Sequence, residues 1–284
     1  YIYIYYMIRI RFKYLLLGIG LLLSLSAIKA QKYTDLIEKS YEYLDKNDLP
    51  AAEESLKAAM HLEPANPHNY ALLTNLGTIQ RRQGKYDDAI LSYTAALSNH
   101  PDNETILSSR ASLYTEMGNL EKAIIDYTSI IFYQPKNENA YYYRGLIYLQ
   151  DKNFMAAEND FNKVLEINEK SVRGRVGHAL LEKQRGNYDQ SERIFNYLIS
   201  EKPNDWSLYE GRADLYFMMG KNARAMADVQ KVFTESEPTA ELYVLRGKIK
   251  IAQLEKSSAA EDFTKAKELG YDSKVIDELM KMTK

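Results

Sequence analysis

Hydrophobic positions follow a helical period through most of this chain. Between Glu104 and Asn137 they form two short amphipathic segments, with Gly118 between them and Pro135 near the end of the second. One face carries Leu107, Arg110, Ala111 and Tyr114 in the first segment, and Ala123, Ile124, Tyr127 and Ile130 in the second. Two helices of about 14 residues each have too little apolar surface to be stable alone in water. The segment is therefore expected to be a helix-turn-helix unit that stacks against copies of itself.

Copies of this unit recur every 34 residues, and three columns stay in register over six units. Two columns hold mostly small residues, because helices cross closely only where the contacting side chains lack bulk; the third holds mostly aromatic residues that fill the space beside each crossing. The columns are Gly77, Ala111, Gly145, Ala179, Ala213 and Gly247; Ala89, Ala123, Ala157, Ser191, Ala225 and Ala259; and Tyr93, Tyr127, Phe161, Phe195, Val229 and Phe263. We therefore predict an all-α fold without strands.

Turn signals place the ends of the units. Glycines recur between the two helices, prolines recur after the second helix, and a final amphipathic segment is expected to cap the last unit. The predicted units lie near residues 33–66, 70–103, 104–137, 138–171, 172–205, 206–239 and 240–270, with the cap at 273–283.

This pattern resembles the tetratricopeptide repeat (TPR) family, and the resemblance covers Tyr33 to about Gly270. It implies a single α-solenoid domain over residues 31–284, with about seven repeats in a right-handed superhelix around a concave groove. The unit from Val172 to Asp205 fits least well, because Ser191 and Glu182 replace residues that pack better in other units, and Gly174 and Gly177 lie in its first helix. We expect the weakest joint of the array there.

The first thirty residues have the layout of a secretory signal. Arg9, Arg11 and Lys13 precede an apolar run from Tyr14 to Ile28, which is short for a membrane-spanning helix. We expect cleavage after Ala30 and a location in the periplasm or cell envelope of a bacterium. Two alternatives are cleavage after Ser26 and an uncleaved membrane anchor. Residues before Met7 are interpreted as an upstream extension.

Composition excludes several classes of function. The formal net charge is −2 over 284 residues, and loss of residues 1–30 would make it −6, so the basic surface typical of nucleic-acid-binding proteins is not expected. The chain has no cysteine, which excludes disulfides and thiolate chemistry. It also lacks phosphate-binding glycine loops and metalloprotease motifs. We expect no enzyme activity, no metal and no cofactor.

Four arginines precede the small column of the first helices. They are expected to extend their aliphatic stems across the helix pair and to bond to an acidic residue of a neighbouring repeat. The arginines are Arg110, Arg144, Arg212 and Arg246, and the candidate acids are Asp126, Asp160, Asp228 and Asp262. His178 takes the place of the arginine in its unit and is interpreted as a packing variant, while His61, His68 and His100 are expected in or near loops.

The resemblance implies that first helices line the groove. The candidate groove residues form a basic patch, an apolar aromatic middle and an acidic patch, which suits a peptide or protein segment with an anchor side chain. They are Arg81 and Arg82; Tyr142, Leu146, Leu149 and Leu180; and Glu210, Asp214, Phe217 and Met218. The family's grip on chaperone C-termini is not expected, because Asn75 is the one residue that matches that motif.

The sequence therefore predicts a non-enzymatic scaffold of the bacterial cell envelope that binds a protein or peptide in its groove. The alternative is a constitutive subunit of an envelope assembly that uses its convex face or its edges.

Overall fold

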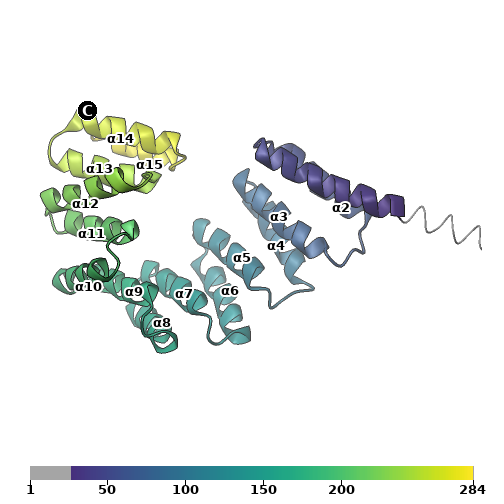
Figure 1. The fold of residues 1–284 in the computed structure, drawn as a ribbon, viewed down its shortest axis with the longest axis horizontal. Coiled ribbons are helices and arrows are strands. Elements are labelled where there is room, and N and C mark those ends of the chain that lie inside the picture. Colours follow the sequence, from purple (N-terminus) through teal and green to yellow (C-terminus); the bar gives the residue numbers. More distant parts are fainter. Residues whose placement is uncertain (1–26, 284) are drawn as a thin grey trace, which may run out of the picture. The chain divides into compact units, whose positions relative to one another are not determined.

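A computed structural model describes residues 27–283. The predicted basic segment and most of the predicted signal sequence lie outside these residues. Over the described range, no helix is long and apolar enough to cross a membrane. The fold is an all-helical array of helix-turn-helix pairs with a terminal helix, as the sequence predicts (Figure 1).

Fifteen helices are present in the described residues. One covers residues 27–45 and precedes the labelled series. The others are α2 (Leu49–Leu62), α3 (Asn69–Arg82), α4 (Tyr86–Leu97), α5 (Glu104–Glu116), α6 (Leu120–Tyr133), α7 (Glu138–Gln150), α8 (Phe154–Ile167), α9 (Val172–Gln184), α10 (Tyr188–Glu201), α11 (Trp206–Met218), α12 (Asn222–Glu235), α13 (Ala240–Ala252), α14 (Lys256–Glu268) and α15 (Ser273–Lys281).

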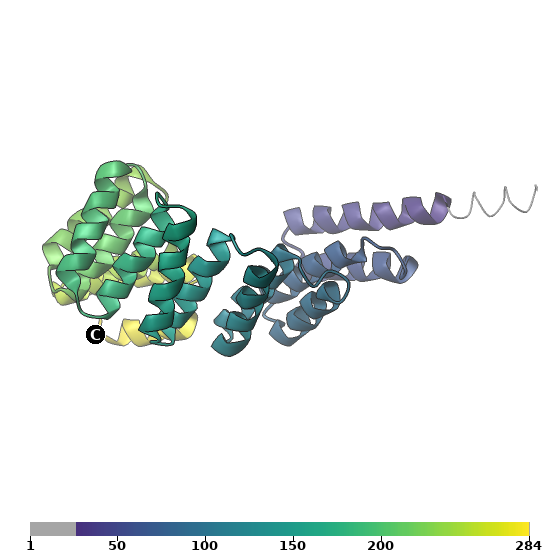
Figure 2. The same cartoon turned by 90° about the horizontal axis from the view of Figure 1, so that it is seen from below.

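The helices group into two compact units, and the boundary between them in the chain falls between Pro135 and Lys136. The first unit contains the helix pairs up to α5 and α6. The second contains the pairs from α7 and α8 to α13 and α14, followed by α15, and Figure 2 shows its helices closely stacked. The boundary does not fall in the repeat from Val172 to Asp205, where the sequence indicates the weakest joint. The expectation that residues 31–284 form a single α-solenoid domain stays a prediction.

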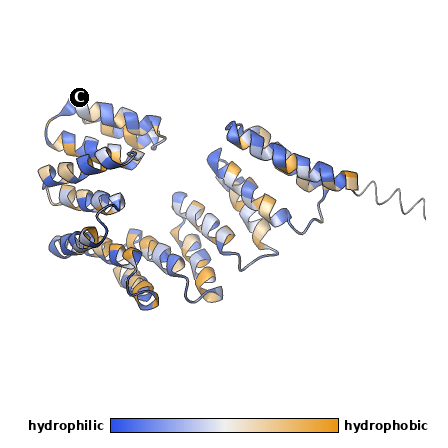
Figure 3. Ribbon diagram, viewed as in Figure 1, coloured by the Kyte–Doolittle hydropathy of each residue, from blue (hydrophilic) through white to orange (hydrophobic). Residues whose placement is uncertain are grey.

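Within each unit, the core follows the columns of small and large residues. Ala89, Ala123 and Ala157 are fully buried, and so is Phe161, which follows Ala157 one turn later on α8. Figure 3 shows the result along the helices, where hydrophobic and hydrophilic positions alternate around each one. Burial of one apolar face per helix drives the stacking.

The turn between the two helices of a repeat needs a left-handed backbone. Glycine supplies it in four repeats, with φ of +75° at both Gly84 and Gly118. Lys152 and Leu254 occupy the same turn position and keep the same conformation, with φ of +59° and +65°. The last turn therefore forms although its glycine is missing.

A buried carboxylate joins the helices of the first unit. Glu53 of α2 accepts hydrogen bonds from Gln80 of α3 and from Lys85, and it pairs with Lys57 one turn away. Burial opposes the ionisation of this carboxyl group, but the bonds from Lys57, Lys85 and Gln80 outweigh it and lower the pKa of Glu53 to about 2. Glu53 therefore carries its charge at neutral pH and links α2 to α3.

Glycines in α9 have a different role from the one that the sequence suggests. A Cβ atom at Gly177 would lie 2.4 Å from Cδ1 of Phe161, and one at Gly174 would lie 2.8 Å from Cδ2 of Leu165. Both glycines therefore let α9 approach α8 closely, and the weakest joint in this repeat stays a prediction. Helix propensity alone predicts a weak helix because it ignores contacts with the neighbouring helix.

Replacement of Gly177 with alanine tests this packing. Alanine favours the helical conformation by up to about 1 kcal/mol, but the overlap with Phe161 should reverse the sign and destabilise the protein by about 1 to 3 kcal/mol. The measurement is the urea midpoint of the full chain. Gln184→Ala, at an exposed position of the same helix, is the control and should change the midpoint little. A higher midpoint for Gly177→Ala would contradict the close approach.

Candidate functional site

First helices of successive repeats lie side by side in the second unit. Arg173 of α9 donates a hydrogen bond to Asn139 of α7. Lys183 of α9 forms an ion pair with Asp214 of α11 at 2.5 Å. These bonds cross from one repeat to the next, so α7, α9 and α11 share one surface, which we call the first-helix face.

Apolar side chains of the predicted site lie on this face. Leu146 and Leu180 are half-buried and both pack against the cluster around Phe161, and Leu180 also reaches the cluster around Phe195. Met218, at the end of α11, is 45% exposed. The structure thus brings Leu146, Leu180 and Met218 onto adjacent helices, with part of the surface of each open.

Three predicted residues are held more firmly in the protein than the sequence suggests. Leu149 is only 7% exposed and belongs to the core between α7, α8 and α9, so it offers a partner almost no surface. Tyr142 is half-buried, with its ring 6.2 Å from that of Phe161, and burial raises its pKa. Phe217 is half-buried against the core of the last repeats. The neighbour of Tyr142, Tyr143, is the more exposed ring at 40%.

Arg81 and Arg82 lie in the first unit, and both have polar partners. Nε of Arg81 is 2.7 Å from a carboxylate oxygen of Glu116, and its Nη2 donates to Ser112. Arg82 donates to the side-chain oxygen of Asn47 at 2.9 Å. The predicted basic patch is therefore partly neutralised by the next repeat, because residues about 34 positions apart become neighbours.

Acidic residues of the predicted site lie on α11. Asp214 is neutralised by Lys183, so it adds little net negative charge to the face. Glu210 is half-buried, and burial together with the charge of Glu241 raises its pKa. Ion pairs therefore reduce the net charge of both the predicted basic patch and the predicted acidic patch.

Asn75, which matches the family's grip on chaperone C-termini, donates a weak hydrogen bond to the hydroxyl of Tyr41 at 3.3 Å. Thr105 accepts a bond from Ser109 within α5. Tyr41, Thr105 and Ser109 therefore place hydroxyl groups at motif positions where members that bind chaperone C-termini have other residues.

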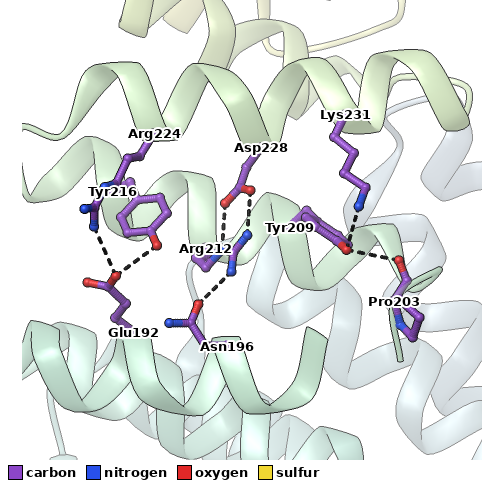
Figure 4. Close-up of polar contacts among 9 residues, drawn as sticks. All are labelled: Glu192, Asn196, Pro203, Tyr209, Arg212, Tyr216, Arg224, Asp228 and Lys231. Carbon is purple, nitrogen blue, oxygen red and sulfur yellow. Dashed lines mark hydrogen bonds and ion pairs between the residues drawn. The ribbon is translucent and has the colours of Figure 1, made fainter. Parts of the chain in front are cut away.

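Buried ion pairs hold the two helices of most repeats together. Figure 4 shows the example of Arg212, whose Nε and Nη2 donate to both oxygens of Asp228 at 2.8 and 2.7 Å. The Arg212 guanidinium also lies over the rings of Tyr209 and Tyr216. The same two-bond pairs join Arg110 to Asp126, Arg144 to Asp160, and Arg246 to Asp262.

Each of these aspartates belongs to the same repeat as its arginine, 16 residues later. The expectation of an acid from a neighbouring repeat is therefore wrong, because the second helix folds back against the first. The neighbouring repeat contributes in another way. Nη1 of Arg110 donates to Thr94 of α4, and Nη1 of Arg212 donates to Asn196 of α10. These arginines bridge two successive second helices.

Loss of one member of such a pair should cost more stability than loss of both. Asp228→Ala leaves the mostly buried guanidinium of Arg212 without its partner and should destabilise the protein by about 3 kcal/mol. Arg212→Met with Asp228→Leu removes both charges and should cost less. Urea midpoints decide this, with Glu235→Ala at an exposed position of α12 as the control. A double-variant cost equal to the sum of the single costs would contradict the coupling.

Second helices also expose large apolar side chains, at positions that the repeat pattern in the sequence does not mark. Ile125 and Phe132 of α6 are 56% and 78% exposed, and Leu91 of α4 is 67% exposed. The equivalents of Ile125 and Phe132 one repeat later are Asn159 and Glu166. A comparison of the outward positions between repeats would have revealed this apolar surface, which adjoins a hollow of about 360 Å³ on α6.

Histidines do not gather in the described residues. His61 and His68 are exposed, and His100 stacks on Tyr70 with ring centroids 3.9 Å apart. Within residues 27–283, no group of three or more His, Asp and Glu side chains is arranged to hold a metal ion.

These features define a helical repeat protein that presents partly open apolar and charged surfaces. Models of the tetratricopeptide repeat match residues 37–104, 138–171 and 176–240. A tetratricopeptide repeat protein from Parabacteroides merdae ATCC 43184 is 69% identical, with a TM-score of 0.77 over 89% of this chain and 99% of the other. The chain belongs to the tetratricopeptide repeat family.

More distant structures share the fold alone. MamA from Desulfovibrio magneticus RS-1 is 14% identical, with a TM-score of 0.52 over 61% of this chain and 97% of the other. A chain of the APC/C hetero-tetramer Cut9–Hcn1 is 12% identical, with a TM-score of 0.58 over 89% of this chain and 53% of the other. No curated protein matches the sequence. TPR proteins are generally protein-interaction scaffolds, and the fold is typically non-catalytic.

Proposed function

We propose that this protein is a non-enzymatic scaffold of the bacterial cell envelope that binds a peptide or protein segment on its first-helix face. The observation that carries the proposal is the set of partly open apolar side chains on adjacent first helices of the second unit. Leu146 and Leu180 pack against the core and keep part of their surface open, and Met218 is 45% exposed.

Such a surface suits an amphipathic or extended segment with one or two apolar anchors. Anchors that become fully buried supply most of the binding energy in peptide recognition, and a surrounding polar rim fixes orientation. The rim here contains the Lys183–Asp214 pair and Glu210, whose raised pKa reflects burial. A segment with a hydrogen-bond donor or a cation opposite Glu210 would complement it.

A matched pair of methionines tests the surface that is used. Met218→Glu places a charge on the first-helix face, and Met155→Glu places the same charge on α8, where the methionine is 74% exposed. Capture of partners from a cross-linked envelope fraction should fall about tenfold or more for Met218→Glu and stay unchanged for Met155→Glu. Both variants should keep the wild-type melting temperature. Equal capture by both would contradict binding at the first-helix face.

The alternative is a constitutive subunit of an envelope assembly that binds through its second helices. The exposed Ile125 and Phe132 on α6 favour it, since the next repeat has the polar residues Asn159 and Glu166 at the equivalent positions. In the same capture experiment, Ile125→Asp with Phe132→Asp would then abolish capture, whereas Met218→Glu would not.

Export is part of the proposal and rests on the basic and apolar segments before Ala30. Among the described residues, 27–32 are exposed and Tyr33 is the first buried one, so cleavage after Ala30 would remove no buried side chain from this part of the chain.

Intact-mass measurement of the protein from its producing cell tests export. The expected chain starts near Gln31, because the apolar run from Tyr14 to Ile28 is short for a stable membrane anchor. A mass that retains Met7 to Ala30 in the membrane fraction would instead identify an uncleaved anchor.

A further inference from the structure

Within the second unit, one repeat lacks the buried ion pair that the three other repeats of this unit contain. In the repeat from Val172 to Asp205, His178 stands at the position of the arginine and Ile194 at the position of the aspartate. Both members of the pair are replaced together, so no unpaired charge is left in the core. The bridge that Arg110 and Arg212 make to the preceding second helix is therefore missing here.

A hollow of about 350 Å³ lies at the place of this missing bridge. Its apolar part is formed by Leu165 of α8 and Ile194 of α10, and the ring of Tyr197 lines it from α10. His178 lies between them on α9, with its ring packed edge-on against Phe161 at 6.0 Å. All of these residues belong to the second unit, so the hollow is formed within one compact body.

Two arginines line the hollow, and neither has a carboxylate partner among the described residues. Arg175 donates to the backbone oxygen of Glu169 at 3.0 Å and lies over the ring of Tyr197 at 5.1 Å. Arg193 donates to the side-chain oxygen of Gln190 at 3.2 Å. Both partners are neutral, so the positive charge of each guanidinium is uncompensated by a direct contact.

Acidic residues near His178 are engaged elsewhere. Glu158 and Glu182 both form ion pairs with Arg185, and neither lines the hollow. Burial lowers the pKa of His178; the charges of Glu158 and Glu182 raise it and that of Arg185 lowers it. The lining therefore combines two arginine charges, an imidazole and an apolar floor, without a carboxylate.

We propose that this hollow binds an organic carboxylate, with the charged group against Arg175 and Arg193 and an apolar body on Leu165 and Ile194. Guanidinium groups bind carboxylates through charge-assisted, often two-bond, contacts. The apolar floor gains free energy only if the ligand covers it, which a small hydrated ion such as inorganic phosphate does not do. The proposal does not depend on binding at the first-helix face.

Nuclear magnetic resonance of the full chain gives a direct test, because the protein has only four histidines. The probe is N-acetylphenylalanine, which carries one carboxylate and one ring. We expect titration to shift the ring-proton signals of His178 and to leave those of His61, His68 and His100 in place. The uncharged amide of the same molecule and inorganic phosphate should bind at least tenfold more weakly. Equal binding of the amide, or no shift of the His178 signals, would overturn the proposal.

Variants assign the binding to the two arginines. Ligand-observed saturation transfer should show a dissociation constant about tenfold higher for Arg175→Gln and for Arg193→Gln. Arg224→Gln, at a guanidinium on α12 outside the hollow, is the matched control and should bind as the wild type does. Unchanged binding by both pocket variants would overturn the proposal.

A variant with the ion pair restored shows whether binding is lost because the hollow is filled or because the protein is unfolded. His178→Arg with Ile194→Asp restores the pair of the other repeats and fills the space. This double variant should keep the wild-type melting temperature or raise it, and it should lose binding of N-acetylphenylalanine. Binding retained in a folded double variant would overturn the assignment to this hollow.

The ligand could be a free carboxylate or the C-terminus of a protein, and one further arm separates these sources. A pentapeptide that ends in phenylalanine with a free carboxylate is compared with N-acetylphenylalanine. Tighter binding of the peptide supports a protein C-terminus as the occupant, and exclusive binding of the small molecule supports a free carboxylate. Either result requires the same contacts with Arg175 and Arg193.

Discussion

Close approach of neighbouring helices is the constraint on which the rest of each unit depends. At Gly177, even one added carbon would lie 2.4 Å from the ring of Phe161, and at Gly145 it would lie 2.6 Å from the same ring. One aromatic side chain thus sits between glycines of two successive first helices. Because Phe161 touches both its own repeat and the next, it couples the packing within a repeat to the packing between repeats. This contact sets the helix spacing that brings Asn139 near Arg173 on the first-helix face.

Buried arginine–aspartate pairs have a different role from the apolar contacts. A pair such as Arg212 and Asp228 gains little net stability over an apolar replacement, but a mismatch at either position leaves a charge without its partner. The pairs therefore favour one register between the two helices of a repeat. The repeat with His178 and Ile194 obeys the same rule, since both charges are absent there together. Its register depends on apolar packing around Phe195, and the space that the pair would fill becomes open to a ligand.

Much of the fold could be predicted from the sequence, because a 34-residue period repeats the same physical requirements many times. The small and aromatic columns locate the helix crossings, and the turn glycines locate the ends of helices. Details that depend on neighbours in space were harder to predict. The burial of Leu149 depends on how α7 sits against α8 and α9, and the role of Gly174 depends on a side chain of the preceding helix. The partner of each buried arginine could have been found from the constant spacing of 16 residues.

The candidate site was less predictable than the fold for a physical reason. Columns that carry packing must keep their residue types, whereas outward positions are free to vary, so no period marks the positions that contact a partner. The charges of Arg81 and Asp214 looked like binding determinants in the sequence, yet each is bonded to a residue about 31 to 35 positions away. In a stacked array, binding positions are therefore better sought where the residue of one repeat differs in type from its equivalents in other repeats.

His178 and Ile194 differ in this way, because they replace the residues of a buried ion pair. Phe132 also differs, because the equivalent outward position one repeat later is acidic. Surfaces of this kind can acquire a binding role while the columns of small and aromatic residues keep the helix crossings.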